Sequence, residues 1–366
     1  MRRITGVLAR WAIFKHIYLV ALAHPGDPLV SEIDGNRTIC RLPTSFKDSR
    51  NLLRRIARFL AWYVAVIRKF RRQELTCINA HSLSTLPLGV ILKAVTGAKL
   101  IYDTHELETE TLNMVGLARF FGKATEAVFV RFADKVVVVG FMIADWYRQR
   151  YPPLDPVVVR NLPEDSPNFE RHDVFRERCN IPASATIFFY QGVLAEARGV
   201  DITLEAFSNA PPTHHVVFLG YGPLSSMIEE YAKLHSNIHY LPAVPPQDVR
   251  RYTQSGDVGM CVAEPECLSY KYGMPNKVFE YLGAGVPAIV SNLPELSCVI
   301  GLSGSGWVIS PNPQELLKLI LSIQRPDILE RGKKALQWTK NNSWAAETVT
   351  LHQMYSQLGF LPPPLS

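Results

Sequence analysis

The sequence is poor in cysteine and contains no long apolar stretch. Its six cysteines include no Cys-x-x-Cys pair and are too sparse for a disulfide scaffold, so we expect reduced, mostly buried thiols in a cytoplasmic protein. No stretch reaches the roughly 18 uncharged apolar residues that a membrane-spanning helix requires. Glycine and proline, at 22 and 26 residues, are too few for collagen-like or low-complexity architectures. The sequence therefore predicts a packed globular protein.

The length and the charge distribution both divide the chain. Single hydrophobic cores stop growing near about 250–300 residues, so the 366 residues predict two domains. The first 160 residues hold 24 Lys and Arg against 13 Asp and Glu, a net charge of +11, and the rest holds 15 against 20, a net charge of −5. A basic first half indicates an anionic partner, such as a membrane surface, a nucleic acid or a phosphorylated substrate, although solvated surface cations would give the same sum.

Short apolar runs alternate with amphipathic segments of helical length, the pattern of βαβ units in a parallel sheet. The strands expected in the first half are 17–23, 39–42, 76–80, 99–103, 135–139 and one within 154–163. Those expected in the second half are 186–191, 215–219, 238–241, 258–262, 288–291 and 306–309, with helices at 199–209, 223–235, 276–284 and 313–323.

This pattern predicts an α/β fold of two Rossmann-like domains with parallel sheets. The expected bounds are 1–160 for the first domain, 161–343 for the second, and 344–366 for a C-terminal helix and tail that crosses back to the first. A ligand is expected in the cleft between the domains, at the carboxyl ends of the strands.

The segment 51–72 predicts a basic amphipathic helix. Its apolar residues recur at three- and four-residue spacing, and its cations crowd its two ends. Such a helix can lie in a membrane interface, attracted by anionic lipids and anchored by Trp62, or it can pack on the first domain with its cations in water. No nucleic-acid readout motif accompanies it, so nucleic acid is not an expected partner. The apolar positions are Leu52, Ile56, Phe59, Leu60, Tyr63, Ile67 and Phe70, and the cations are Arg54, Arg55, Arg58, Arg68, Lys69, Arg71 and Arg72.

The stretch 273–291, GMPNKVFEYLGAGVPAIVS, predicts a short helix followed by a strand. A Pro-Asn pair starts the helix and two glycines after position 282 end it. Lys277 then lies in the first turn and Glu280 one turn later on the same face. Exposed amides at a helix N-terminus beside an ammonium suit a phosphate, and a carboxylate one turn on suits the hydroxyls of a ribose. A surface Lys–Glu pair is the alternative for this stretch alone.

Two more predicted strands end in glycine. In YQGVLAEARGVDITLEAF, Gly192 allows close approach of a ligand to the backbone, and Arg198 can hold a diphosphate with its planar fork. In VVFLGYGPL, Gly220 and Gly222 stand between a strand and a helix. No Gly-x-Gly-x-x-Gly with an acidic residue about 20 positions on is present, which argues against a dehydrogenase.

The segments YQGVLAEARGVD, FLGYGPL and PNKVFEYLGAGVPAIVSN resemble the nucleotide-binding domain of family-4 "group 1" retaining glycosyltransferases, which have the GT-B fold and use nucleotide-sugars. INAHSLSTLPLG and KLIYDTHELETE are similar to acceptor-side strands of that family. The resemblance spans about residues 17 to 310 and implies a glycosyltransferase of hexosyl or N-acetylhexosaminyl type, with a UDP-sugar favoured as donor.

The resemblance also implies a set of site residues. Arg198 and Lys277 would bind the donor diphosphate and stabilise the leaving nucleotide, Glu280 would bind the ribose, and His105 would lie near the transferred sugar; a hydrogen-bonded structural histidine is the alternative for His105. The complete set is His105, Arg198 and Lys277 as catalytic residues, and Gly192, Arg198, Gly220, Gly222, Ala243, Val244, Lys277 and Glu280 as donor-binding residues, with Ala243 and Val244 near the base.

Three features depart from the family pattern. Tyr272 stands where the family has the first of two glutamates, so that carboxylate is absent or supplied by Glu264 or Glu266. Val193 stands where an arginine often follows the first glycine. Residues 3–14 already read as a helix, so the first domain is expected to lack the opening strand of the family.

The expected chemistry needs no metal and no other cofactor. Glycosyl transfer has an oxocarbenium-like transition state, and cations that stabilise the departing diphosphate would supply the main assistance. No Asp-x-Asp is present, in agreement with a metal-independent donor site. The expected partners are a nucleotide-sugar donor, a glycan or lipid-linked acceptor and, through helix 51–72, the cytoplasmic face of an anionic membrane. A non-catalytic nucleotide-binding subunit and a GT-B nucleotide-sugar epimerase remain as alternatives.

Overall fold

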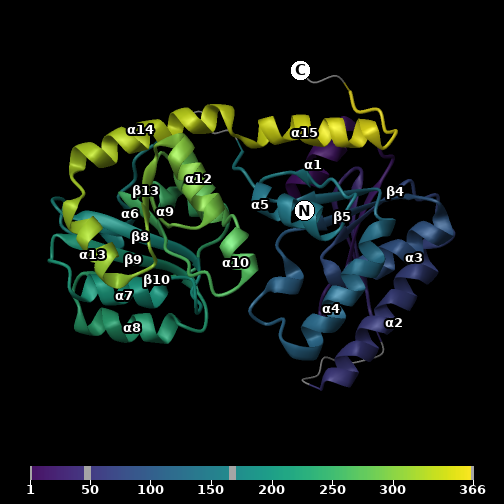
Figure 1. The fold of residues 1–366 in the computed structure, drawn as a ribbon, viewed down its shortest axis with the longest axis horizontal. Helices are drawn as coiled ribbons and strands as arrows, with labels where there is room; N and C mark the ends of the chain where they lie inside the picture. Colours follow the sequence, from purple (N-terminus) through teal and green to yellow (C-terminus); the bar gives the residue numbers. More distant parts are fainter. Residues whose placement is uncertain (1, 45–50, 165–169, 364–366) are drawn as a thin grey trace.

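The computed structural model describes residues 2–44, 51–164 and 170–363, which form two α/β domains side by side (Figure 1). Residues 364–366 of the expected tail lie outside the described residues. Among the described residues, no helix is both long enough and apolar enough to cross a membrane.

The second domain contains a six-stranded, wholly parallel sheet in the order β10-β9-β8-β11-β12-β13. All six strands expected from the apolar runs are present, and the last two have the expected bounds. The strands are β8 Thr186–Val193, β9 His214–Tyr221, β10 Ile238–Pro242, β11 Val258–Cys261, β12 Ala288–Ser291 and β13 Gly306–Ile309.

Helices cover both faces of this sheet, because successive apolar side chains along β8 point to opposite faces and both sets are buried. Ile187 and Phe189 pack on one side, against α6, α11 and α12, while Phe188 and Tyr190 pack on the other, against α7, α8 and α13. Residues buried on both faces give the continuous apolar runs that identified these strands. The helices are α6 Val174–Cys179, α7 Val200–Ser208, α8 Ser225–Leu234, α9 Val249–Thr253, α10 Leu268–Tyr272, α11 Asn276–Gly283, α12 Pro294–Ser303, α13 Pro313–Ser322 and α14 Arg325–Asn341.

The first domain holds two sheets where one parallel sheet was expected. A four-stranded parallel sheet has the order β4-β5-β6-β7, and a three-stranded sheet has the order β1-β3-β2. The described chain begins with helix α1. Strand β1 pairs with β3, and among the described residues it does not join the sheet of β4. The elements are α1 Arg2–Trp11, β1 Ile17–Leu22, β2 Val30–Asp34, β3 Arg37–Leu42, α2 Leu52–Phe70, β4 Cys77–His81, α3 Leu86–Thr96, β5 Lys99–Thr104, α4 Gly116–Phe129, β6 Lys135–Val138, α5 Phe141–Arg150 and β7 Val157–Val158.

The expectation of purely parallel strands was wrong at β2, which runs antiparallel to β3. The two strands form a hairpin, and in its turn the Asp34 carboxylate accepts hydrogen bonds from the backbone of Asn36 and the guanidinium of Arg37. Four of the five β2 residues are exposed, so no apolar run announced the strand. The strand expected within 154–163 is reduced to the two residues of β7.

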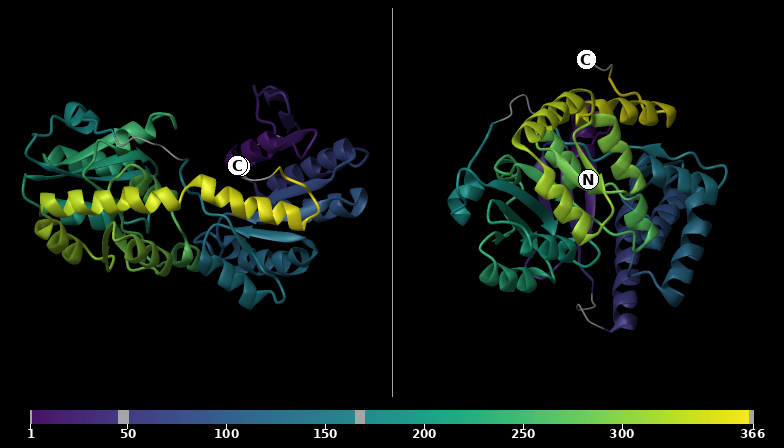
Figure 2. Two further views of the ribbon diagram at one scale, coloured as in Figure 1. Left: turned by 90° about the horizontal axis from the view of Figure 1, so that it is seen from above. Right: turned by 60° about the vertical axis from the view of Figure 1, so that its left-hand side comes forward.

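The C-terminal helix α15 (Trp344–Gln357) returns from the second domain to the first, and Figure 2 shows it continuing the line of α14 across both. Leu351, Met354 and Tyr355 pack against Val7 of α1 and Ile101 of β5. Glu347, with 6% of its side chain exposed, accepts hydrogen bonds from the guanidinium of Arg160 at 2.7 and 2.9 Å and from its backbone N–H at 2.7 Å.

The domains also meet beside the cleft. The Glu295 carboxylate of α12 accepts a hydrogen bond from the backbone N–H of Met142 at 2.6 Å, so the second domain caps the N-terminus of α5. Ser269 of α10 donates to Glu106 at 3.1 Å, and Leu268 and Tyr272 pack against the first-domain core. These contacts hold the carboxyl edges of the two parallel sheets toward each other.

The Arg160–Glu347 pair should be a stabilising contact of the tail. Replacing Glu347→Ala leaves a largely buried guanidinium without its carboxylate and should lower the free energy of unfolding in urea by about 3 kcal/mol. As a matched control, Glu330→Ala removes the exposed ion pair with Lys334 and should change it by less than about 0.5 kcal/mol. Equal effects of the two substitutions would contradict this assignment.

Candidate functional site

The ends of β8 and β9 form the floor of the candidate site, where Gly192 pairs with Gly220. Gly192 has φ of 119°, which side chains rarely adopt, and a β-carbon there would lie 3.7 Å from the Lys277 side chain. A β-carbon on Gly220 would lie 1.9 Å from the carbonyl oxygen of Gly192, and one on Gly222 2.1 Å from that of Leu194. Backbone packing between the two strand ends therefore accounts for Gly220 and Gly222 without a ligand.

Lys277 extends from the first turn of α11 to the end of β8. Its ammonium lies 3.3 Å from the centroid of the Tyr190 ring, a cation–π contact. Burial, with a smaller contribution from the positive charge of Arg198, lowers the pKa of Lys277 to about 8. No carboxylate of the described residues forms an ion pair with it, and a desolvated ammonium in that state is suited to receive an anion.

Arg198 lies in the turn between β8 and α7. Its Nε donates a hydrogen bond to the Tyr270 hydroxyl at 3.2 Å, and its guanidinium lies 5.3 Å from the centroid of that ring. Tyr270 belongs to α10, the helix that contacts the first domain. Sequence reasoning missed Tyr270, because nothing within the sequence links position 270 to the loop at 198.

Glu280 lies one turn beyond Lys277 and is held by a chain of hydrogen bonds. Its carboxylate accepts from the Gln191 side chain at 2.5 Å, and Gln191 in turn accepts from the Thr253 hydroxyl at 2.8 Å. Gln191 is buried, so this chain fixes the direction of the carboxylate. Gln191 was seen in the sequence only as a strand end.

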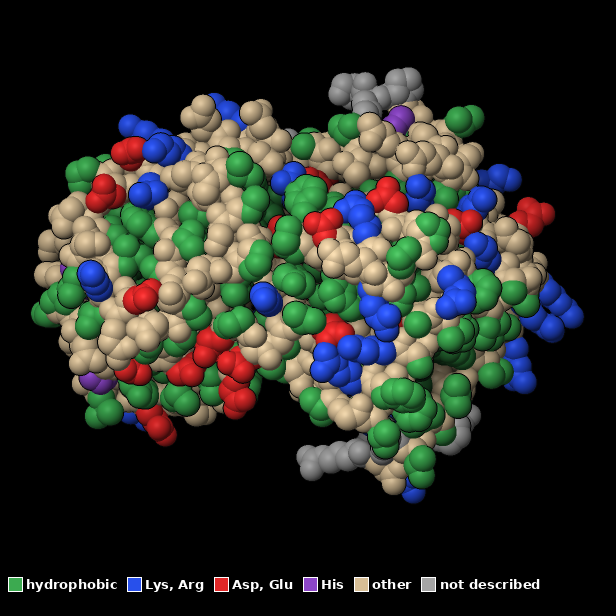
Figure 3. Space-filling view, viewed as in Figure 1, with side chains coloured by type: hydrophobic (Ala, Val, Ile, Leu, Met, Phe, Trp, Pro, Cys, Tyr) green, Lys and Arg blue, Asp and Glu red, His purple; other side chains and the backbone are tan. Residues whose placement is uncertain are grey.

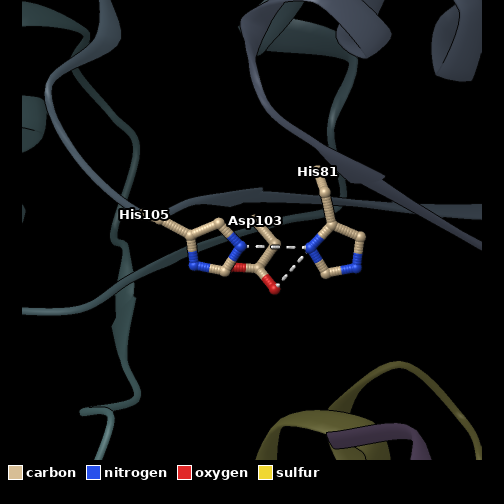
Figure 4. Close-up of side chains that lie close together, drawn as sticks. All are labelled: His81, Asp103 and His105. Atoms are coloured by element: carbon tan, nitrogen blue, oxygen red, sulfur yellow. Dashed lines mark hydrogen bonds and ion pairs between the residues drawn. The ribbon is translucent and has the colours of Figure 1, made fainter. Parts of the chain in front are cut away.

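The first domain contributes His105, which follows β5, together with two residues that the sequence analysis did not select (Figure 4). His81 ends β4, and its Nδ1 lies 3.4 Å from Nε2 of His105 and 3.1 Å from a carboxylate oxygen of Asp103. Burial lowers the pKa of His105. Parallel pairing of His81 with Asp103 in β4 and β5 was a usable signal, since it places both side chains at one sheet edge.

A pocket brings the two halves of the site together. Asp103 and His105 line it from the first domain, and Asn276 and Glu280 line it from α11 of the second. Arg3 of α1 also lines it, and its guanidinium donates to the backbone carbonyl of Leu162 between the domains. The structure thus places His105 and Glu280 on one pocket.

Two groups of predicted residues lie around this centre. Ala243 and Val244 follow β10 at the same edge of the sheet, next to the Pro242–Gly220 pair. Glu264 follows β11, and burial and the neighbouring charges of Asp201 and Glu266 raise its pKa. Tyr272 stands where the first glutamate was expected, and its side chain packs on the first-domain core.

The sequence comparisons each match part of the chain, and the family model matches the second domain. Residues 185–325 match the family model described as Glycosyl transferases group 1. A protein of Bacillus subtilis (strain 168), named as a teichuronic acid biosynthesis glycosyltransferase, TuaC, is 27% identical over 134 residues. That stretch covers 37% of this chain and 32% of the relative, so the match spans about a third of the curated relative's length.

Solved structures match nearly the whole chain. Sucrose-phosphate synthase from Thermosynechococcus elongatus has a TM-score of 0.81 at 16% identity, over 98% of this chain and 92% of its own. Anabaena HepE in complex with UDP-glucose has a TM-score of 0.71 at 12% identity, over 93% and 100%. WaaG, a glycosyltransferase involved in lipopolysaccharide biosynthesis, has 0.67 at 16% identity, over 96% and 94%. At these identities the likeness shows the fold: the chain has the GT-B arrangement of two Rossmann-like domains, as the resemblance implied.

The environment of Lys277 predicts an unusual titration. After reductive methylation with ¹³C-formaldehyde, one lysine resonance should titrate near pH 8, whereas exposed lysines titrate near about 10.4. Lys277→Arg should remove that resonance and leave the α-amino signal, which titrates in a similar range. If all lysine resonances titrated together near pH 10, the ammonium would not be desolvated as described.

Proposed function

We propose that this chain is a retaining glycosyltransferase that moves a sugar from a UDP-sugar to a glycan or lipid-linked acceptor. The match of residues 185–325 to group 1 glycosyl transferases supports a donor-binding second domain. The observation that carries the proposal is the pair of cations, Lys277 and Arg198, at the edge where Gly192 leaves the backbone open. HepE, a protein of the same fold, is known in complex with UDP-glucose.

In this proposal the donor diphosphate lies between Lys277 and Arg198, at the amide groups that open α11. Glu280, held by Gln191, accepts hydrogen bonds from the ribose hydroxyls, and the backbone at Ala243 and Val244 contacts the base. The sugar then extends into the pocket that Glu280 shares with His105. The acceptor approaches from the first domain.

The catalytic work is electrostatic. As the bond to the sugar breaks, negative charge grows on the diphosphate, and preorganised cations in a partly desolvated site stabilise it more than they stabilise the substrate. Lys277 and Arg198 supply that charge without a metal on the diphosphate. The acceptor hydroxyl attacks from the face that the diphosphate leaves and gives its proton to a departing phosphate oxygen, so the anomeric configuration is retained.

Tyr272 favours a second candidate, a nucleotide-binding subunit without catalytic activity. The tyrosine replaces a carboxylate at a position where the resemblance implies one, and it packs between the domains. The two candidates differ in turnover: a transferase releases UDP from UDP-sugar, at least slowly to water, whereas a binding subunit releases none.

The proposal also includes peripheral attachment to an anionic membrane through the first domain. Helix α2 buries Trp62, Val66 and Phe70 but leaves a second apolar stripe in solvent, with Leu53 75%, Ile56 47% and Leu60 56% exposed. On α4, Leu117, Phe120 and Phe121 are also exposed. Figure 3 shows hydrophobic side chains gathered over this end of the first domain, with Lys and Arg beside them. Arg54 and Arg55 are exposed, whereas Arg58 is buried. An apolar stripe flanked by cations suits an anionic lipid interface.

The two cations should determine donor binding. Lys277→Met and Arg198→Gln should each weaken UDP binding about 10- to 100-fold in calorimetry, because each removes a charged hydrogen bond to the diphosphate. Lys318→Met, an exposed lysine of α13, is the matched control and should bind as the wild type does. Full transfer activity in both site variants would overturn the proposal.

Binding should also take up protons above pH 8. The free Lys277 amine is largely neutral there because its pKa is about 8, and a bound diphosphate raises that pKa and draws a proton onto the amine. At pH 8.5 the calorimetric enthalpy should therefore depend on the ionisation enthalpy of the buffer. In Lys277→Arg, whose guanidinium stays charged, that buffer dependence should vanish.

Membrane attachment should depend on the outer stripe of α2. Leu53→Ser combined with Leu60→Ser should weaken sedimentation with phosphatidylglycerol vesicles by at least about tenfold, since each leucine contributes about 1.5–3 kcal/mol when buried. Leu234→Ser, at an equally exposed leucine of α8 in the second domain (79%), is the control. Unchanged sedimentation of the double variant would show that α2 does not contact the membrane. Added salt should weaken vesicle binding, because it screens the attraction between the cations and the anionic lipids.

A further inference from the structure

We propose that His81, Asp103 and His105 bind one divalent transition-metal ion, with Zn²⁺ the ion that best suits two imidazoles and a carboxylate. The three residues come from the carboxyl ends of β4 and β5, on the first-domain side of the pocket. The donor site proposed above contains no metal, and this ion would lie on the opposite wall. The inference does not depend on glycosyl transfer.

Two of the distances between possible donor atoms match those around a tetrahedral ion, and one such atom from each of the three residues lies within 4.8 Å of the others. Two ligands bound at about 2.0–2.1 Å to a tetrahedral Zn²⁺ lie about 3.3 Å apart. Nδ1 of His81 lies 3.4 Å from Nε2 of His105 and 3.1 Å from Oδ2 of Asp103. Figure 4 shows these two nitrogens pointing toward each other with the carboxylate beside the gap between them. Binding one ion would require both imidazoles to turn so that their lone pairs converge on it.

A cation bound beside Asp103 would compensate the negative charge of its buried carboxylate. Only 3% of its side chain is exposed, and its Oδ2 accepts no hydrogen bond although His81 lies within reach. Among the described residues, its ion-pair partners are these two histidines, with no lysine or arginine within 4 Å. A buried carboxylate without a cation is costly. A metal ion would neutralise it, and both imidazoles would bind in their neutral form.

A second pair of neighbouring histidines in the chain, which has no carboxylate beside it among the described residues, serves as a comparison for His81 and His105. The rings of His215 and His239 are also nearly parallel, with an interplanar angle of 12° against 8° for His81 and His105, and their ring nitrogens lie 2.9 Å apart. No carboxylate joins them in a potential metal cluster within the described part of the chain. Their contact is a short hydrogen bond between two rings, whereas the first-domain pair is wider and includes a buried anion.

The fourth position of the ion would face the pocket. Asp103 and His105 both line that pocket, opposite Glu280 and Asn276 of α11. A three-ligand site with an open position toward a cleft is the arrangement of metal sites that bind a water or a substrate oxygen. The class of ligand expected there is an oxygen donor, such as a sugar hydroxyl or a phosphate.

The experiment is direct metal binding to the full chain. After dialysis against a chelator, titration with Zn²⁺ should show one equivalent bound to the wild type. His81→Gln and Asp103→Asn should weaken it at least about 100-fold, because even residues that only support a metal ligand contribute about 10- to 100-fold. His215→Gln should bind as the wild type does. Thermal unfolding without metal, together with UDP binding, would show that each variant is folded.

Cobalt substitution separates this site from the cysteines, of which Cys298 is exposed. Co²⁺ bound to two imidazoles and a carboxylate should give visible d–d bands without a thiolate charge-transfer band. No stoichiometric Zn²⁺ binding by the wild type would overturn the proposal, and so would undiminished binding by Asp103→Asn or a thiolate band that accounts for the bound metal.

Discussion

The ammonium of Lys277 lies against the Tyr190 ring at the end of β8, and the rest of the donor site is arranged around that charge. Desolvation lowers its pKa to about 8, and within the described parts of the chain no carboxylate forms an ion pair with it. Gly192 is favoured as a glycine by its φ of 119°, which side chains rarely adopt, and a β-carbon there would make only an ordinary van der Waals contact with the lysine. Such an arrangement is costly without an anion and favourable with one. The site is thus preorganised for charge that a ligand brings.

Contacts between the two domains position the residues around that cation. Helix α10 carries Tyr270, which contacts Arg198, and also Ser269, which contacts Glu106 of the first domain. Glu295 caps α5, and α15 ties the end of the chain to α1 and β5. Because α10 contacts both Arg198 and the first domain, relative movement of the domains should change the contact between Tyr270 and Arg198.

The second domain was largely predictable from the sequence, because strands buried on both faces leave continuous apolar runs and its site residues stand within single motifs. Lys277 and Glu280 share one helix, and Gly192 ends the strand that precedes Arg198. Residues that act through contacts distant in the sequence were missed. Tyr270 and Gln191 depend on tertiary packing that no local pattern reveals.

The first domain was less predictable. Strand β2 is mostly exposed and pairs within a hairpin, so its sequence lacks the apolar run of a buried parallel strand. His105 and Asp103 stand in one motif, of which only His105 was selected as a site residue, whereas His81 required the register of β4 against β5. Helix α2 has one apolar stripe that packs on the first domain and a second that is exposed. The sequence pattern did not separate the two stripes, because it assumes a single apolar face.

The central claim is that one ligand contacts both domains across the cleft. Hydrogen–deuterium exchange with and without UDP-glucose tests it most directly, because it reports backbone protection along the whole chain at once. The account predicts simultaneous protection at residues 190–199 and 276–283 of the second domain and at 103–106 of the first. Protection absent from the first two segments, or confined to the second domain, would contradict it.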